Sequence, residues 1–372
     1  MRTKSIFFLL MLFLSSLGIS LSAQNSILVA SSGTNAKKII QLDATDGTVI
    51  NSNFIDLSLQ GAGFPKGIAQ VGDHIWITDQ TLDRIYIYTT AGAYVSSITT
   101  NLNNNRGLTV VNNNEVWVSN GDTGNGATED TIVRFSTTGT LLGTYPAPNT
   151  VVFDVVDNNN GTVYVSGLDT NGIQKLDYSG VSQGNLVAPG VFQNLQQINL
   201  MASGNLLAVV FQTHNTSGNV AGVYSISTAN GAILNTWPVS DLRGVIEMGN
   251  GNILYTTGTG LYQIDVATGV KTQLLTGSLQ FMCKATIQQL AVKEVEKPTY
   301  KIFPNPVADF LSIEGDTSID VIKVFAVDGK LVQTQTVNAK KYMLNVRNLP
   351  KGNYLISVGS NGQFTQQKFI KK

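Results

Sequence analysis

Three short segments combine a cation with a glycine: Lys66-Gly67, Arg106-Gly107 and Arg243-Gly244. Long cationic side chains bind carboxylates, phosphates and sulfated sugars, and the planar guanidinium of arginine can do so with two parallel hydrogen bonds. A glycine beside each cation lets the backbone lie close to a neighbouring segment. If the fold gathers these segments, we expect a site for an anionic ligand. The alternative is that internal bridges occupy the cations, with backbone carbonyls or with acids on nearby loops: Asp79, Asp83, Asp122 and Asp169.

A second candidate site is the acidic, glycine-rich segment NGDTGNGATED, residues 120–130. Carboxylate and amide oxygens are the ligands that Ca²⁺ prefers, which makes Ca²⁺ the one candidate cofactor. The spacing differs from that of the twelve-residue EF-hand loop, which ends on a bidentate Glu. A surface turn without metal is the alternative. The candidate ligands are Asp122, Asn125, Glu129 and Asp130.

The chain has only two histidines, His74 and His214, and one cysteine, Cys283. His214, in QTHNTSGN, is the candidate for ligand binding or proton transfer. A general base needs a partner and an orienting group, and no Ser-His-Asp or His-Glu arrangement follows from the spacing. Cys283 lies in the apolar run LQFMCKATI, which favours a buried hydrophobe over a nucleophile. The sequence therefore assigns no catalytic residue.

Composition excludes some partners and indicates export. The 372 residues carry 24 Lys or Arg and 24 Asp or Glu, so there is no strong field for nucleic acid. One cysteine allows no internal disulfide. At the N-terminus, Arg2 and Lys4 precede an apolar run and small residues up to Ala23, which is typical of a cleaved secretory signal. An uncleaved anchor is the alternative. No later stretch is long enough to span a membrane.

The same succession of strands and turns recurs along most of the chain. Its second strands centre on Trp76, Trp117, Tyr164, Leu207 and Leu254, a spacing of about 41–47 residues. A repeat of this length with strands separated by polar turns is typical of four-stranded propeller blades.

The two ends of the repeated region are complementary. Residues 26–54 contain the second, third and fourth strands of a blade, whereas residues 279–287 contain only a first strand. Together they complete one blade and remove two open sheet edges, which predicts six blades. A solenoid is the alternative, but it would need capping ends rather than complementary fragments.

Over about residues 24–290 this layout resembles the six-bladed propellers of the NHL-repeat, streptogramin-lyase and gluconolactonase kind. In a propeller, the loops that lead into the first strands surround one mouth of the channel. The resemblance implies that Lys66, Arg106, Arg243 and His214 lie on that face. A lyase of this kind would place a His near the channel. A lactonase would hold a metal there, for which the first strands offer Asp154, Asn199 and Glu247.

Residues 300–372 follow a different pattern. Apolar and polar residues alternate between turns at Asp328-Gly329 and Lys351-Gly352, which predicts a small Ig-like antiparallel β-sandwich of about six or seven strands. The segment resembles the type A C-terminal sorting domain of the type IX secretion system of Bacteroidetes. The matching residues are Tyr300, Phe303, Pro304, Asn305, Pro306, Val324, Asp328, Gly329, Lys330, Leu349, Gly352, Tyr354 and the closing FIKK.

Together these patterns predict an all-β protein with a signal peptide (1–23), a six-bladed β-propeller (24–290), a linker (291–299) and a sorting domain (300–372). The resemblance implies export by the type IX machinery, to the medium or the cell surface. The leading functional hypothesis is a non-catalytic module that binds a glycan, peptide or protein at the channel face. The alternatives are a lyase or lactonase that uses a metal or His there, and a structural spacer.

Overall fold

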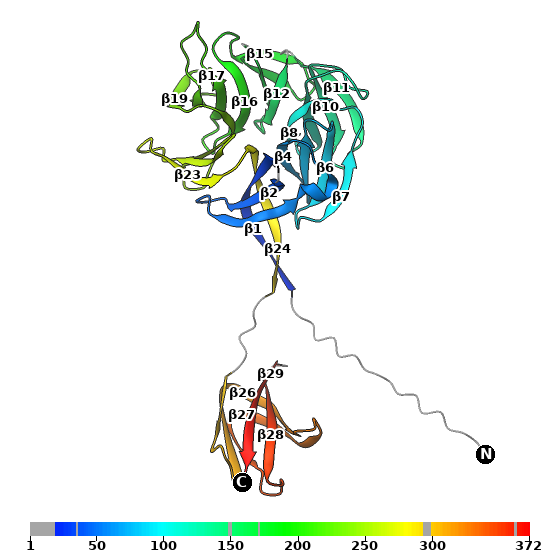
Figure 1. The fold of residues 1–372 in the computed structure, drawn as a ribbon, viewed down its shortest axis with the longest axis vertical. Coiled ribbons are helices and arrows are strands. Elements are labelled where there is room, and N and C mark those ends of the chain that lie inside the picture. The colour runs from blue at the N-terminus through cyan, green and yellow to red at the C-terminus, as the bar shows by residue number, and fades with distance from the viewer. Residues whose placement is uncertain (1–18, 35, 148–150, 170–171, 293–298, 361–362) are drawn as a thin grey trace, which may run out of the picture. The chain divides into compact units, whose positions relative to one another are not determined.

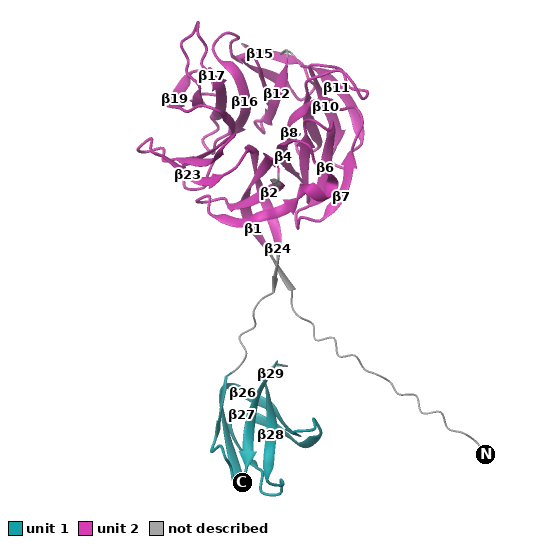
Figure 2. Cartoon of the chain, viewed as in Figure 1, with its two compact units in different colours: residues 1–20, 292–372 teal, residues 21–291 magenta. Residues whose placement is uncertain are grey.

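The computed structural model describes residues 19–34, 36–147, 151–169, 172–292, 299–360 and 363–372. The chain forms two compact units, one of residues 21–291 and one that contains residues 292–372 (Figure 2). Most of the predicted signal peptide (1–18) and of the predicted linker (293–298) lies outside the described residues. Among the described residues, no helix has the length and apolar character needed to cross a membrane.

The larger unit is built from antiparallel four-stranded sheets arranged about a common centre (Figure 1). One described 3₁₀ turn, η1 (Leu57–Gln60), interrupts the strands. Successive strands pair within each sheet, as the repeat predicts. The sheets are β4 (Pro65–Val71), β5 (His74–Asp79), β6 (Arg84–Thr89) and β7 (Tyr94–Ile98); β8 (Asn105–Val111), β9 (Glu115–Asn120), β10 (Thr131–Ser136) and β11 (Leu141–Pro146); β12 (Val152–Asp157), β13 (Thr162–Gly167), β14 (Ile173–Asp177) and β15 (Ser182–Val187); β16 (Gln193–Leu200), β17 (Leu206–Gln212), β18 (Gly222–Ile226) and β19 (Ile233–Pro238); and β20 (Leu242–Glu247), β21 (Ile253–Thr257), β22 (Gly260–Ile264) and β23 (Lys271–Thr276).

A further sheet joins segments from the two ends of this unit. Its strand order is β24 (Leu279–Val292), β1 (Ile19–Gly33), β2 (Ala36–Asp43) and β3 (Val49–Asp56). The first-strand sequence near residue 280 thus pairs with the segment that lacks a first strand. The backbone groups of both segments are satisfied within one sheet.

The core of the larger unit lies between neighbouring sheets. The aromatic residues that recur in the second strands, Trp76, Trp117 and Tyr164, are at most 3% exposed. The fourth strands, such as β7 and β23, are largely exposed. Bulky second-strand residues therefore fill the space between sheets, while the outer strands face solvent.

The smaller unit is one antiparallel sheet of five described strands: β25 (Tyr300–Phe303), β26 (Phe310–Ala326), β27 (Leu331–Asn345), β28 (Gly352–Ser360) and β29 (Gln363–Lys371). The expected six or seven strands become five because β26 and β27 are long. Their pairing register shifts between Glu314 and Ile319, and each strand continues through this irregularity instead of ending there. Buried apolar residues, among them Leu311, Ile356 and Phe369, form a core within this unit.

Candidate functional site

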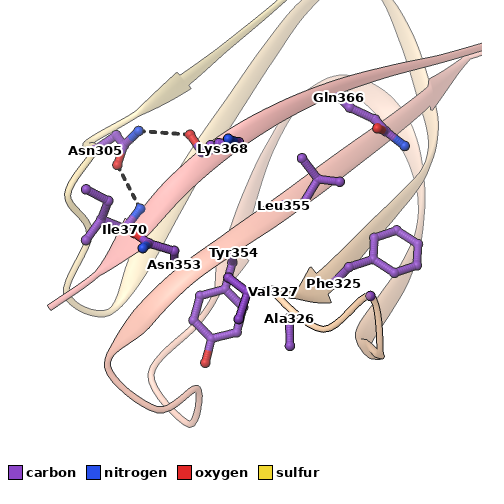
Figure 3. A pocket seen from close by; sticks show the side chains of 11 residues that line it. Asn305, Phe325, Ala326, Val327, Asn353, Tyr354, Leu355, Gln366, Lys368 and Ile370 are labelled. Atoms are coloured by element: carbon purple, nitrogen blue, oxygen red, sulfur yellow. Dashed lines mark hydrogen bonds between the residues drawn. The ribbon is translucent and has the colours of Figure 1, made fainter.

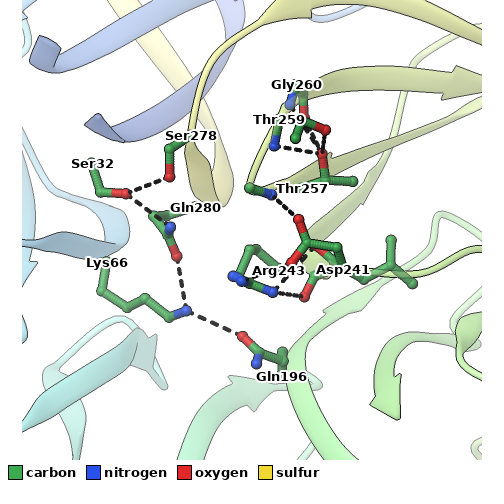
Figure 4. Close-up of polar contacts among 12 residues, drawn as sticks. Ser32, Lys66, Gln196, Asp241, Arg243, Thr257, Thr259, Gly260, Ser278 and Gln280 are labelled. Atoms are coloured by element: carbon green, nitrogen blue, oxygen red, sulfur yellow. Dashed lines mark hydrogen bonds and ion pairs between the residues drawn. The ribbon is translucent and has the colours of Figure 1, made fainter. Parts of the chain in front are cut away.

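Each first strand carries one residue near its start that the sequence predicts to face the mouth of a channel. These positions are equivalent in the repeat: Lys66, Arg106, Phe153, Gln196, Arg243 and Gln280. We call this group the channel mouth. Four of its members and their partners are drawn in Figure 4.

Lys66 lies inside the channel mouth. It is 3% exposed, and its Nζ donates to Oε1 of Gln196 at 3.1 Å and of Gln280 at 2.9 Å (Figure 4). The ammonium also lies over the rings of Phe153 and Phe281, with 5.0 and 4.8 Å to their centroids. Burial lowers its pKa well below the usual range, and the nearby cations Arg243 and Arg106 lower it further. Its described hydrogen-bond partners are neutral, and the nearby carboxyl of Asp154 offsets part of the pKa shift.

Arg106 is also buried. Its Nη1 donates to the carbonyl oxygen of Val152 at 2.6 Å, and its guanidinium lies 5.0 Å from the ring centroid of Phe153. Its Nε is a buried donor without a partner among the described residues. Burial lowers the pKa of the guanidinium, which Asp122 and Asp130 partly offset. Arg106 thus forms a bridge to a backbone carbonyl of the next sheet, which is one of the two arrangements considered from the sequence.

Arg243 is the most accessible of the three cations, with 21% of its side chain exposed. It pairs with Asp241 at 2.9 Å and lies over Phe211, 4.7 Å from the ring centroid. Asp241 is also fixed by the N–H of Gly258 at 3.0 Å. Spacing did not identify Asp241, although it stands only two residues before Arg243. Figure 4 shows that Arg243 and Lys66 extend toward the same central space.

His214 lies in the loop between β17 and β18 and is 7% exposed. Its Nδ1 is 3.0 Å from the N–H of Ser217 and 2.9 Å from the hydroxyl of that residue. The ring is therefore held by the turn that contains it.

The side chains of the loop 120–130 make separate contacts. Asp122 accepts from Nδ2 of Asn104 at 2.8 Å, Asn125 donates to the carbonyl of Thr99 at 2.8 Å, and Asp130 accepts from the N–H of Val151. The backbone of Glu129 donates to Thr123. Within the described ranges, no group of three or more His, Cys, Asp or Glu side chains is placed to hold a metal ion.

Buried hydroxyls tie neighbouring sheets together beside the channel mouth. The pairing of first and second strands is irregular there, for example between Pro65 and Ile68. The freed backbone groups are bound by a hydroxyl instead. Ser119 accepts from the N–H of Gly107 at 2.9 Å and donates to the carbonyl of Phe153 in the next sheet at 2.9 Å. The hydroxyls that bridge sheets in this way are those of Thr78, Ser119, Ser166 and Thr256.

Sequence inspection missed these hydroxyls, although the repeat contains their signal. Each stands two residues after the centre of its second strand, in the pairs Trp76 and Thr78, Trp117 and Ser119, Tyr164 and Ser166, and Leu254 and Thr256. A small hydroxyl side chain at a repeated buried position indicates a hydrogen bond that the fold requires.

A cavity of about 280 Å³ opens at the other ends of the first strands. It is lined by β4, β8, β12, β16 and β24 and includes Asn199 and Cys283. Two buried acids line it, Asp154 and Asp157, and Asp154 accepts from the N–H of Ile198 at 2.9 Å. A Cβ at Gly107 would lie 1.8 Å from Oδ1 of Asp154, so the glycine makes room for this carboxyl. Burial raises the pKa of Asp154 to about 8.

The smaller unit has a larger cavity, about 680 Å³, which we call the sorting groove (Figure 3). It extends over the ends of β26 and β28 and over β29. Four of its residues belong to the motif recognised in the sequence, namely Asn305, Gly329, Tyr354 and Ile370. Its other members are Phe325, Ala326, Val327, Asn353, Leu355, Gln366 and Lys368.

The fold defines an all-β protein whose larger unit is propeller-like. A chain in the crystal structure of a nidogen/laminin complex superposes with a TM-score of 0.58 at 17% identity, covering 71% of this chain and all of that one. A protein of unknown function from Bacteroides caccae gives a TM-score of 0.51 at 14% identity, covering 71% and 99%. Virginiamycin B lyase from Staphylococcus aureus gives 0.42 at 14% identity, covering 82% and 94%, which is too loose to support an argument.

Residues 301–372 match the family described as "Secretion system C-terminal sorting domain". This match indicates export by type IX secretion to the cell surface or the extracellular space, with handling by that machinery. A sequence comparison with curated proteins finds no relative.

Proposed function

We propose that this exported protein is a six-bladed β-propeller that acts as a non-catalytic binding module, holding an acidic group of its ligand at the channel mouth. The predicted boundaries, 24–290 for the propeller and 300–372 for the sorting domain, are part of this proposal. Ring closure is supported by Gln280 of β24, which accepts from Lys66 of β4 and, through its carbonyl, from Thr256 of β21.

The observation that carries the binding proposal is the excess of positive charge at the channel mouth. Lys66 and Arg106 are buried with neutral partners, and Arg243 is their accessible neighbour. Asp241 is the one carboxylate that forms an ion pair with any of the three in the described part of the chain. Arg243 would contact the ligand, while Arg106 and the protonated form of Lys66 add favourable potential from below. A uronic or sulfated glycan, or an acidic peptide, has the required charge.

A thermal-shift measurement on the full chain tests this proposal, with polygalacturonate and a sulfated oligosaccharide as probes and with Ca²⁺ or chelator present. A ligand at about a hundred times its Kd stabilises the folded protein by roughly 2.7 kcal/mol. Arg243→Ala should abolish the shift. Lys271→Ala, which removes an exposed cation from the outer strand β23, should preserve it. A shift that survives Arg243→Ala would place the ligand elsewhere.

A lyase or lactonase is the second candidate, and Asp154 favours it. A buried carboxyl with a raised pKa beside a cavity is a common feature of active sites. This acid directly follows Phe153 of the channel mouth, and Lys66 is close enough to lower its pKa in part. Chromatography of the same probes after prolonged incubation distinguishes the two functions. Product that forms with the wild type and not with Asp154→Asn would establish catalysis.

A further inference from the structure

The sorting groove combines apolar side chains with a cation on one face of the sheet. Phe325 of β26 pairs with Leu355 of β28, and Leu355 pairs with Lys368 of β29. Residues directly opposite one another on neighbouring strands project to the same side, so these three form one row across the sheet. Asn353 and Ile370 form the next row.

The motif residues in the groove are mostly engaged in holding the unit together. Asn305 donates to the carbonyl of Lys368 at 3.1 Å and accepts from the N–H of Ile370 at 2.9 Å, which fixes the edge of β29 (Figure 3). Tyr354 is 7% exposed, stacks on Phe369 with centroids 5.4 Å apart and donates its hydroxyl to Pro350. These side chains shape the groove rather than present themselves to a partner.

Other side chains of the groove are accessible. Val327 is 83% exposed and Ile370 is 46% exposed. Lys368 is exposed, and its ammonium has no ion-pair partner within the described residues. An exposed apolar cluster beside a free cation is a typical docking surface, because burial of the apolar area and pairing of the charge both favour association.

The charge of this segment indicates the chemistry of its partner. Residues 301–372 contain ten Lys or Arg and five Asp or Glu, a net charge of +5, whereas the whole chain is neutral. A surface with this excess attracts an acidic partner and accelerates the encounter. Because the sorting family implies handling by the export machinery, a component of that machinery is the occupant to which charge and family both point.

We propose that the secretion machinery holds this chain by the sorting groove, through an apolar segment that carries a carboxylate opposite Lys368. Val327 and Ile370 supply the apolar contact, and Lys368 supplies the charge pair. Asn305 and Tyr354 are positioning residues that keep β28 and β29 in place. The proposal rests on export by the type IX system and adds the surface that this system recognises.

The test is secretion of full-length variants from a bacterium that has the type IX system. Val327→Glu places a charge in the apolar contact and Lys368→Glu reverses the charge pair. Each should lower the secreted fraction by about tenfold, with full-length protein retained in the periplasm. The matched control is Met343→Glu, because Met343 is 66% exposed on the same unit but does not line the groove. It should be secreted like the wild type.

Two further measurements separate the possible failures. Thermal melting of the purified variants should be unchanged, since both altered side chains are exposed. If Val327→Glu misfolds, Lys368→Glu still tests the groove. Deletion of residues 301–372 reports on the export route itself, and secretion of that variant would overturn the type IX assignment. Normal secretion of Val327→Glu and Lys368→Glu, with the deletion blocked, would overturn the groove alone. Equal retention of Met343→Glu would also overturn it.

Discussion

Ser119 donates a hydrogen bond from its Oγ to the carbonyl oxygen of Phe153, 2.9 Å away, and so joins two sheets that are separate in hydrogen-bonding topology. The hydroxyl also accepts from the N–H of Gly107. One buried side chain therefore satisfies two backbone groups that the irregular strand pairing leaves free.

Removal of such a hydroxyl should destabilise the larger unit. Thr78→Val keeps the shape of the side chain but leaves the N–H of Gly67 and the carbonyl of Arg106 without this partner. We expect a loss of about 1–3 kcal/mol in the free energy of unfolding, measured by urea denaturation. Thr272→Val, on the exposed strand β23, is the matched control and should change stability by less than about 0.5 kcal/mol. Equal effects of the two substitutions would contradict this role.

Asp154 should make stability depend on pH. Its pKa is raised to about 8 by burial, so the folded protein keeps a proton that the unfolded chain releases near pH 4. Stability should therefore fall as the pH rises from about 4 to about 8, by up to about 1.4 kcal/mol per pH unit. Asp154→Asn has no proton to lose and should flatten the profile of melting temperature between pH 5 and 8. A variant with the slope of the wild type would exclude Asp154 as the cause.

Cys283 should be unreactive in the folded protein. Although the residue as a whole is only partly buried, burial of the thiol raises its pKa to about 12. Because the thiolate is the nucleophile, labelling by a disulfide reagent at pH 8 should be at least about a hundredfold slower than in urea. Rapid labelling of the native chain would indicate an accessible thiolate in the cavity beside Asp154.

Asn305 should stabilise the smaller unit directly. Asn305→Ala removes two hydrogen bonds to the edge of β29 and should cost about 1–2 kcal/mol in the unfolding of that unit. Asn353→Ala is the control, because Asn353 lines the same groove and its side chain forms no described hydrogen bond. Hydrogen exchange of the β29 amides measures the difference. Unchanged protection in Asn305→Ala would show that β29 is held by other contacts.

The periodic features of the sequence predicted most of the fold. Trp76, Trp117 and Tyr164 recur because each sheet needs a bulky second-strand residue, and all three are buried. The contacts of Lys66 could not be foreseen in the same way. Its partners Gln196 and Gln280 stand 130 and 214 residues further along the chain. A repeat shows that these positions are equivalent, but not which way each side chain projects.

The same limit applies to the site. Whether a cation contacts a ligand or a backbone carbonyl depends on the strand pleat and on irregular strand pairing. The alternation of apolar and polar residues in the sequence does not determine either of these. Arg106 lies against Val152 because β8 and β12 pack together, a contact between separate repeats. Asp241, by contrast, stands two residues before Arg243, so this ion pair could have been predicted from the sequence.

The pairing of β24 with β1 makes the sheet at the start of the larger unit depend on a segment at its end. β1 precedes the other described strands along the chain, and its neighbour β24 is supplied by residues 279–292, just before the smaller unit. A chain that ends early leaves β1 with an open edge and buried groups unsatisfied. A chain that stops before residue 279 therefore lacks both the neighbour of β1 and the sorting sequence at 301–372, so we expect it to fold incompletely and to lack its export signal.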